Sequence, residues 1–228
     1  MPRALRSFEV GGVYHIINRG VEKRRIFVKD QDYSRFILGL EFFNQQNPGL
    51  LWPLIAKAGP GPAKLGETLY KERKNKKQPI VELLAFALMP NHYHLVIREI
   101  IQGGISLFMV KMGGYVTYFN KQYNRVGPLF QSRFKAVSIK EDDQLSTVFA
   151  YVHTNPIELF EPGWKGGQIK NRRKVLARLT DYRWSSFRDY LGMPTFPYAI
   201  NQDFFLNLYG GTTGCRQVVE NRIAYKTL

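Results

Sequence analysis

Two histidines separated by one residue, His92 and His94, form the pattern in this sequence that is best suited to metal chemistry. They open an apolar run over residues 92–97 that is typical of a strand in the centre of a sheet. Because side chains alternate between the two faces of a strand, both imidazoles point to one face, about 6–7 Å apart along the backbone. Two imidazoles in that position can share one divalent metal ion, although two core histidines would produce the same spacing.

A tyrosine and an asparagine four residues apart, Tyr151 and Asn155, supply a second chemical pair. On a helix they share one face, with their side chains about 5–6 Å apart. Next to a metal ion, the amide oxygen of Asn155 can act as a ligand while the phenol attacks a phosphorus held against the same ion. Since a phenolate is also a good leaving group, the phosphotyrosine bond is reversible, which suits strand transfer better than hydrolysis.

Spacing alone does not choose this tyrosine. Tyr118 and Gln122 are also four residues apart, on a long helix predicted before the last strand. A tyrosine on an apolar helix face is commonly a core residue, and Asn155 is also a normal residue to end a helix before Pro156. The residue pattern therefore leaves Tyr151 and Tyr118 open as candidates.

The charge of the chain indicates a polyanionic partner. Its 33 Lys and Arg residues against 18 Asp and Glu residues give a net charge of +15, more than solubility requires. The basic residues are spread among aromatic and strand-like segments and do not line one amphipathic helix, which favours nucleic acid over a membrane surface.

The remaining composition predicts an ordinary folded protein in a reducing compartment. The chain has 228 residues and a single cysteine, Cys215, which cannot form an internal disulfide. Its first residues contain no apolar targeting segment, and no run of apolar residues is long enough to span a membrane. We therefore expect a cytoplasmic protein, associated with the nucleoid, that has no membrane partner.

The order of predicted elements is β-α-β-β-α-β followed by one more helix, which is the α+β, ferredoxin-like plan of an antiparallel sheet with helices on one face. Asp30 is the expected N-cap of the first helix, and the second helix is expected to continue through Gly113 and Gly114. A two-residue connection, Pro90 and Asn91, predicts a hairpin between the middle strands. The predicted strands cover residues 13–18, 81–89, 92–99 and 133–140, and the predicted helices cover residues 33–43, 105–123 and 145–155.

Two segments interrupt or follow this plan. Residues 48–79 combine a Gly-Pro-Gly-Pro stretch with a run of charges and are predicted to be a basic insertion. We expect a catalytic domain over residues 8–162, including that insertion, and a small helical C-terminal appendage over residues 163–228.

Four segments in this order resemble the single-tyrosine HUH transposases, and most closely the REP-associated tyrosine transposases among the IS200-like enzymes. These segments are residues 13–20, 89–96, 127–135 and 151–156, and residues 184–192 are similar to the tryptophan-serine-serine segment that such proteins carry after the catalytic domain. The chain departs from the pattern at Tyr93, an aromatic residue between the two histidines, and in the length of its insertion. Four ordered motifs are far more specific than any one of them.

The resemblance implies a role for each candidate residue. His92 and His94 would bind Mg²⁺ or Mn²⁺, Asn155 would complete the metal site, and the nucleophile would be Tyr151, not Tyr118. Contacts to the DNA backbone are expected from three cations, Arg19, Arg133 and Lys135.

The implied activity is that of a metal-dependent transposase or endonuclease. It would cleave and rejoin hairpin-flanked single-stranded DNA through a 5′-phosphotyrosine intermediate, with palindromic repeats as the hairpins. A binding module for single-stranded DNA or RNA without catalysis, and a nickase of the replication-initiator or relaxase type, remain the alternatives. The C-terminal appendage favours a monomer, although a homodimer is also compatible with the family.

Overall fold

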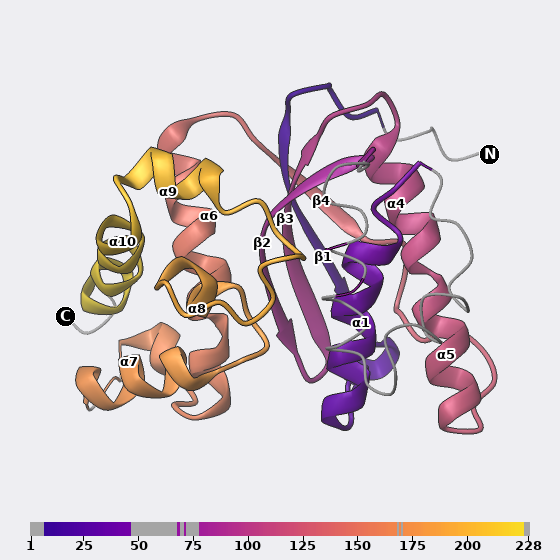
Figure 1. Cartoon of the computed structure of the whole chain (residues 1–228). Coiled ribbons are helices and arrows are strands. Elements are labelled where there is room, and N and C mark those ends of the chain that lie inside the picture. The colour runs from indigo at the N-terminus through magenta and orange to yellow at the C-terminus, as the bar shows by residue number, and fades with distance from the viewer. Residues whose placement is uncertain are drawn as a thin grey trace.

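A four-stranded sheet with helices on both faces forms the body of the protein (Figure 1). The structure, a computed structural model, describes residues 7–46, 68, 71, 78–167, 169 and 171–225. The predicted insertion, residues 48–79, therefore lies almost entirely outside the described residues.

The sheet has the strand order β2-β3-β1-β4, and every neighbouring pair is antiparallel. This order confirms the predicted ferredoxin-like α+β plan. The strands are β1 (Val13–Arg19), β2 (Val81–Met89), β3 (His92–Glu99) and β4 (Lys135–Ile139). β3 and β1 lie in the centre, so the side chains of His92 and His94 are held by a strand with a partner on each side.

Three helices cover one face of the sheet: α1 (Asp30–Phe42), α4 (Gly104–Met112) and α5 (Gly114–Gln122). Tyr93, between the two histidines of β3, points to this face, where its ring lies 4.9 Å from that of Phe36 on α1. Tyr93 is almost fully buried there. The neighbouring histidines must therefore point to the opposite face.

The first helix begins differently from the prediction. Its N-cap is Lys29, and Asp30 is the first helical residue. The capping carboxylate belongs to Asp32, which accepts hydrogen bonds from the backbone N–H groups of Val28 and Lys29 at 2.8 and 3.0 Å. Asp32, in a buried position at the third residue of the helix, can reach back to these N–H groups over the first turn. Asp30, the predicted cap, is exposed.

The single long helix predicted over residues 105–123 is also wrong in detail, because it is divided into α4 and α5 at Gly113. Around Gly113 the backbone hydrogen bonds span three residues, as in a 3₁₀ turn. The N–H of Gly113 donates to the Val110 carbonyl and the N–H of Val116 donates to the Gly113 carbonyl, at 3.0 Å each. A Cβ at Gly113 would lie 2.8 Å from the Val110 carbonyl oxygen, so the tight turn requires glycine.

The other face of the sheet is covered by α6 (Asp142–Thr154), as Figure 1 shows. A 3₁₀ turn, η2 (Asn155–Leu159), continues directly from it. The C-terminal segment then adds four helices, with α10 packed along α6 (Figure 1). They are α7 (Arg172–Asp181), α8 (Phe187–Tyr190), α9 (Asp203–Tyr209) and α10 (Thr212–Tyr225), preceded by the 3₁₀ turn η3 (Trp164–Gly166).

The C-terminal segment is fastened to the outer strand of the sheet, β2. The backbone N–H of Leu88 donates to the carbonyl of Trp184 at 2.9 Å, and that of Ser186 donates to the carbonyl of Phe86 at 3.0 Å. These bonds cover a strand edge that would otherwise expose unpaired backbone groups. The buried apolar cluster is continuous between the sheet and this segment. In the part of the chain that the structure describes, no helix is long and apolar enough to cross a membrane.

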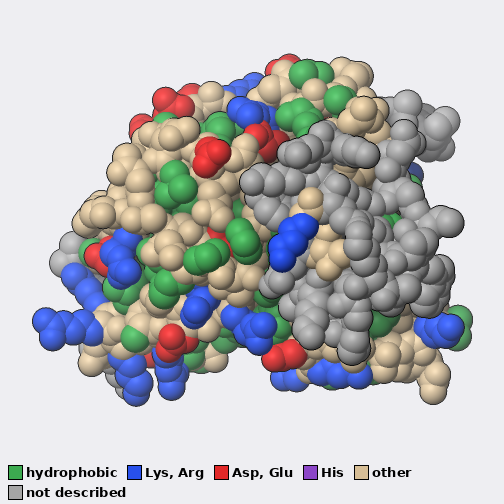
Figure 2. Space-filling model, in the orientation of Figure 1, with side chains coloured by type: hydrophobic (Ala, Val, Ile, Leu, Met, Phe, Trp, Pro, Cys, Tyr) green, Lys and Arg blue, Asp and Glu red, His purple; other side chains and the backbone are tan. Residues whose placement is uncertain are grey.

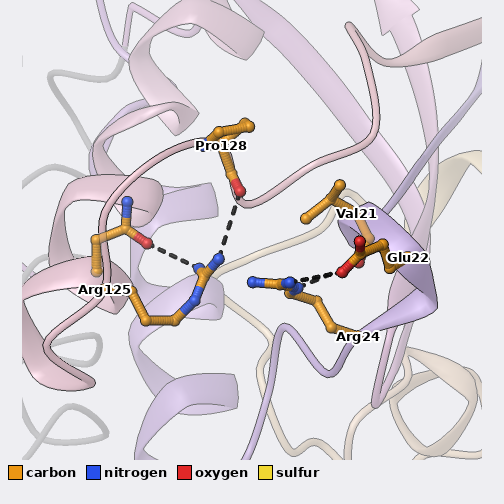
Figure 3. Close-up of polar contacts among 6 residues, drawn as sticks. Val21, Glu22, Arg24, Arg125 and Pro128 are labelled. Atoms are coloured by element: carbon orange, nitrogen blue, oxygen red, sulfur yellow. Dashed lines mark hydrogen bonds and ion pairs between the residues drawn. The ribbon is translucent and has the colours of Figure 1, made fainter.

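The end of β1 is held by a loop that precedes β4. The N–H of Val21, in the 3₁₀ turn η1 (Val21–Lys23), donates to the carbonyl of Leu129 at 2.9 Å. Figure 3 shows that Arg125 donates to the Pro128 carbonyl on one side of this junction, while Arg24 donates to the Val21 carbonyl and pairs with Glu22 on the other. Because both segments are fixed, the end of β1 stays beside the start of β3, where His92 lies.

Candidate active site

His92 and His94 lie on the same face of the sheet, as the strand alternation predicted. The structure shows that α6 covers this face. Their ring centroids are 5.0 Å apart, and the ring planes are nearly perpendicular. His94 is only 2% exposed, whereas His92, at the start of the strand, is partly exposed. The pair therefore has one buried and one accessible imidazole.

Each of the two imidazoles has its Nδ1 atom engaged. His92 Nδ1 lies 2.6 Å from the amide oxygen of Asn91, which can only accept, so this nitrogen donates and Nε2 keeps its lone pair. His94 Nδ1 lies 2.8 Å from Nε2 of His15. Among the described residues, the buried Nε2 of His94 has no hydrogen-bond partner. A buried nitrogen without a partner beside a second imidazole fits a bound divalent cation.

Both histidines are neutral at physiological pH, as metal ligands must be. Burial, reinforced by the charges of Arg19 and Lys165, lowers the pKa of His92 to about 4. Burial likewise holds the pKa of His94 well below its ordinary value. For His15, burial and then the charge of Lys135 lower the pKa to about 4.

Tyr151 projects from α6 toward these histidines. Its ring centroid lies 5.4 Å from that of His94 and 5.8 Å from that of His15, with both contacts close to perpendicular. The rival tyrosine, Tyr118, lies on the other side of the sheet, where its hydroxyl donates to Asp32 at 3.0 Å. The geometry thus brings Tyr151, and not Tyr118, beside the histidine pair.

Asn155 lies at the C-terminal end of α6, one turn after Tyr151. It is buried, and its Nδ2 donates to the carbonyl of Tyr151 at 3.0 Å. The described residues contain no cluster of three His, Cys, Asp or Glu side chains that could hold a metal. A cation held by the two histidines would therefore take further oxygen ligands from the Asn155 amide, from water or from a phosphate.

Residues 65–155 match the family model described as "Transposase IS200 like". Over these residues the chain is similar to the IS200-like transposases. The matched segment includes both histidines, Tyr151 and Asn155. The family resemblance inferred from the motifs is thereby confirmed at the level of IS200-like transposases.

The other comparisons give one further similarity. A solved structure described as "Structure of the REP associates tyrosine transposase bound to a REP hairpin" aligns with a TM-score of 0.48 and 14% sequence identity, covering 89% of this chain and 93% of that chain. No curated protein matches the chain.

Two of the three cations predicted to contact DNA lie on the face of the sheet that carries His92 and His94. Arg19 is exposed and is paired in register with His92 across β1 and β3. Lys135 is exposed on β4 opposite Ile17, which places it on the same face. Arg133 instead lines a cavity of about 440 Å³ on the other face, which Tyr93 also lines. A role of Arg133 at this site stays a prediction.

Three residues of this site were missed by the sequence analysis. His15 occupies a predicted strand, but its contact with His94 depends on β1 pairing with β3, which no local pattern reveals. Lys165 and Arg222 come from outside the matched IS200-like segment, and both approach the Tyr151 ring. The sequence around them indicates only that the C-terminal segment is basic, and it does not connect either residue with Tyr151.

Proposed function

We propose that this chain is a metal-dependent, single-tyrosine transposase that cleaves and rejoins single-stranded DNA beside a hairpin. The observation that carries the proposal is the position of Tyr151, whose ring lies 5.4 Å from that of His94 on the facing strand. A tyrosine that is to attack a phosphate must lie within a few ångströms of the groups that hold that phosphate. The family of residues 65–155 supports the same class of reaction.

His92, His94 and Asn155 are the residues that would hold Mg²⁺ or Mn²⁺. The unpartnered Nε2 of His94 and the engaged Nδ1 of His92 support this assignment. When bound, the cation would polarise the scissile phosphate and offset the charge on its non-bridging oxygens. His15 would hold the His94 ring in orientation through the 2.8 Å contact between their nitrogens.

In the proposed reaction, the hydroxyl oxygen of Tyr151 attacks the phosphorus and loses its proton. The bond between phosphorus and the 3′ oxygen breaks, and that oxygen takes up a proton to become a free 3′-hydroxyl. The product is a 5′-phosphotyrosine on Tyr151. A free 3′-hydroxyl can later attack such a bond, which restores the phosphodiester and releases the tyrosine.

The substrate follows from the charge of the surface around the site. Arg19 and Lys135 are exposed on the same face as the histidines, and the net charge of the chain is +15. Figure 2 shows Lys and Arg side chains gathered at the lower left, over α7. The exposed basic residues of α7 are Arg172, Arg173, Lys174 and Arg178. A duplex stem next to a single strand, as in a palindromic repeat, would carry enough phosphates to occupy this surface.

The proposal includes a monomer as the acting unit. Tyr151 contacts His94 and His15 of its own chain, so the nucleophile and the metal ligands do not need a second copy. Size-exclusion chromatography of the protein with hairpin DNA would test this part separately.

The decisive experiment is incubation of the full chain with end-labelled, hairpin-containing single-stranded DNA and Mn²⁺. We expect a covalent protein–DNA band that is lost with EDTA and in Tyr151→Phe, and that persists in Tyr118→Phe. A band that survives in Tyr151→Phe would overturn the assignment of the nucleophile. Hairpin binding with no covalent band for any palindromic repeat of the source genome would instead indicate the non-catalytic binding module.

A further inference from the structure

Two cations from the C-terminal segment lie over the ring of Tyr151. Arg222, on α10, places its guanidinium carbon 5.3 Å from the ring centroid, and Lys165, in η3, places its Nζ 5.8 Å from it. The two residues come from separate elements that converge on the same side chain of α6. Both lie outside residues 65–155, the segment that matches the transposase family.

Neither cation has an anionic partner among the described residues. The Nε of Arg222 is buried and has no hydrogen-bond partner there. Burial also lowers the pKa of Arg222, and the neighbouring Tyr151 opposes this shift. On the same helix, Arg216 is paired with Glu220 at 3.7 Å, so α10 does offer a carboxylate partner to other cations.

An unpaired guanidinium that is partly withdrawn from water costs free energy unless an anion joins it. The anion that must come to Tyr151 in the proposed reaction is a phosphodiester. Guanidinium groups bind phosphate oxygens in a bidentate manner, and an ammonium group adds a second positive charge. Charge on the non-bridging oxygens is greatest in the transition state, where positioned cations have their largest effect.

We infer that Arg222 and Lys165 form a phosphate clamp, which binds the non-bridging oxygens of the phosphate that reacts at Tyr151. The inference rests on the proposed function and extends it, because it makes the C-terminal helix a functional part of the active site. Arg222 is a catalytic residue in this arrangement, since it touches the reacting group. The clamp also holds the 5′-phosphotyrosine that the first step leaves.

A different role for the same contact would be packing alone, through cation–π attraction to the Tyr151 ring. The two roles predict different results when the scissile phosphate is replaced by an uncharged linkage. A methylphosphonate linkage replaces one charged non-bridging oxygen by a methyl group, so a cation that serves that charge becomes dispensable. A cation that only packs against the tyrosine matters equally for both linkages.

The test measures the rate of covalent adduct formation by wild type, Arg222→Gln and Lys165→Gln on DNA with a phosphodiester or a methylphosphonate at the scissile position. On the phosphodiester we expect Arg222→Gln to be slower than wild type by about 10²-fold. On the methylphosphonate the difference should fall to a few-fold. Equal slowing on both linkages, or no slowing on either, would overturn the clamp. Arg216→Gln is the matched control on the same helix, because Arg216 is partly exposed and is paired with Glu220, and it should keep the wild-type rate.

A second measurement does not depend on catalysis. In EDTA, the affinity for the single-stranded oligonucleotide is measured over a range of salt concentrations. Loss of one phosphate contact should reduce the slope of log K against log salt by about 0.7 in Arg222→Gln, and by none in Arg216→Gln. An unchanged slope in both Arg222→Gln and Lys165→Gln would contradict the clamp. A wild-type protein that forms no adduct would contradict the proposed function and leave this slope readable. Lys165 is exposed in a short turn, so its variant keeps the test usable if Arg222→Gln does not fold.

Discussion

The ring of Tyr151 on α6 lies 5.4 Å from the ring of His94 on β3, with an angle of 89° between the two planes. The two residues belong to different layers, a helix and the sheet that it covers. Their contact therefore depends on how α6 packs against the sheet, and α10 packs along the outer side of α6 (Figure 1). A site built between layers is sensitive to residues that lie well away from the reacting atoms.

The first prediction concerns His15, which lies behind His94. Its Nε2 is 2.8 Å from His94 Nδ1, so it orients the imidazole that would bind the metal. Replacement of such a partner typically weakens metal affinity by about 10–100-fold. We expect His15→Gln to bind Mn²⁺ with affinity reduced by that factor, measured by electron paramagnetic resonance of free Mn²⁺. Ser138→Ala on the exposed part of β4 should bind Mn²⁺ like wild type, and equal affinity in His15→Gln would contradict the orienting role.

The sequence predicts the parts of this fold that depend on local pattern. The alternation in residues 92–99 correctly separates the face of His92 and His94 from that of Tyr93. The order of strands and helices correctly predicts the sheet. Both follow from the spacing of apolar residues, which repeats every second residue in a strand and every three to four residues in a helix. Every residue of a segment contributes to such a pattern.

The features that the sequence does not reveal depend on contacts between distant segments. Asp32 supplies the carboxylate that caps the start of α1, and Tyr118 and Tyr123 also donate to it in the core. The break at Gly113 depends on the tight turn between α4 and α5, and many helices tolerate a single glycine. Arg222 reaches Tyr151 only because α10 packs along α6. No spacing rule relates residues that are joined solely by tertiary packing.

The second prediction concerns the contribution of Asp32, the residue that binds the hydroxyl of Tyr118, to the stability of the fold. Asp32 is fully buried and accepts hydrogen bonds from Tyr118, from Tyr123 and from two backbone N–H groups. Asp32→Asn replaces the charged acceptor and should lower the free energy of unfolding by about 2–4 kcal/mol. Asp30→Asn, at an exposed position of the same first turn, should change it by less than about 1 kcal/mol. Urea denaturation measures both, and similar values for the two variants would contradict a buried structural role of Asp32.

A related result is expected for Tyr118→Phe. It removes a single bond to Asp32 and should lower the free energy of unfolding by about 1 kcal/mol. Adduct formation should remain at the wild-type level, because Tyr118 lies on the face of the sheet away from the histidines. Loss of the adduct in this variant, at unchanged stability, would favour the rival tyrosine.

The third prediction is a pH dependence of stability that comes from Asp189. Burial raises the pKa of this carboxyl above its ordinary value, against the hydrogen bonds from the N–H groups of Thr195 and Phe196. Because the folded pKa is raised, the folded protein binds a proton that the unfolded chain has already lost. This contribution to stability is therefore greatest at low pH and is lost as the pH rises from the unfolded pKa through the folded one.

Asp189→Asn replaces the carboxyl group by an amide that does not take up a proton, so the variant lacks this pH-dependent contribution to stability. Relative to wild type, the free energy of unfolding of the variant should rise with pH across that window, with a slope of at most about 1.4 kcal/mol per pH unit. Chemical denaturation in EDTA at several pH values above 4 measures the difference. Asp203→Asn, at an exposed position of α9, serves as the control and should follow the wild-type curve. A difference of opposite sign would show that burial of Asp189 does not govern its protonation.

The last prediction concerns Ser186, which joins the C-terminal segment to the sheet and to α6. Its hydroxyl accepts from the Phe86 N–H at 2.9 Å, lies 3.2 Å from the Phe86 carbonyl and is 2.8 Å from Nε2 of His153. All of these atoms are buried, so Ser186→Ala leaves the Phe86 N–H and the His153 ring without this partner, at a cost of about 1–3 kcal/mol. Because this segment covers the edge of β2, we also expect Ser186→Ala to speed hydrogen exchange at the Phe86 and Leu88 amides relative to wild type, more than at the other amides of the strand. Ser138→Ala is the matched control, since its hydroxyl is exposed. Unchanged exchange at both amides would show that the edge is held by the backbone bonds of Trp184 and Ser186 alone.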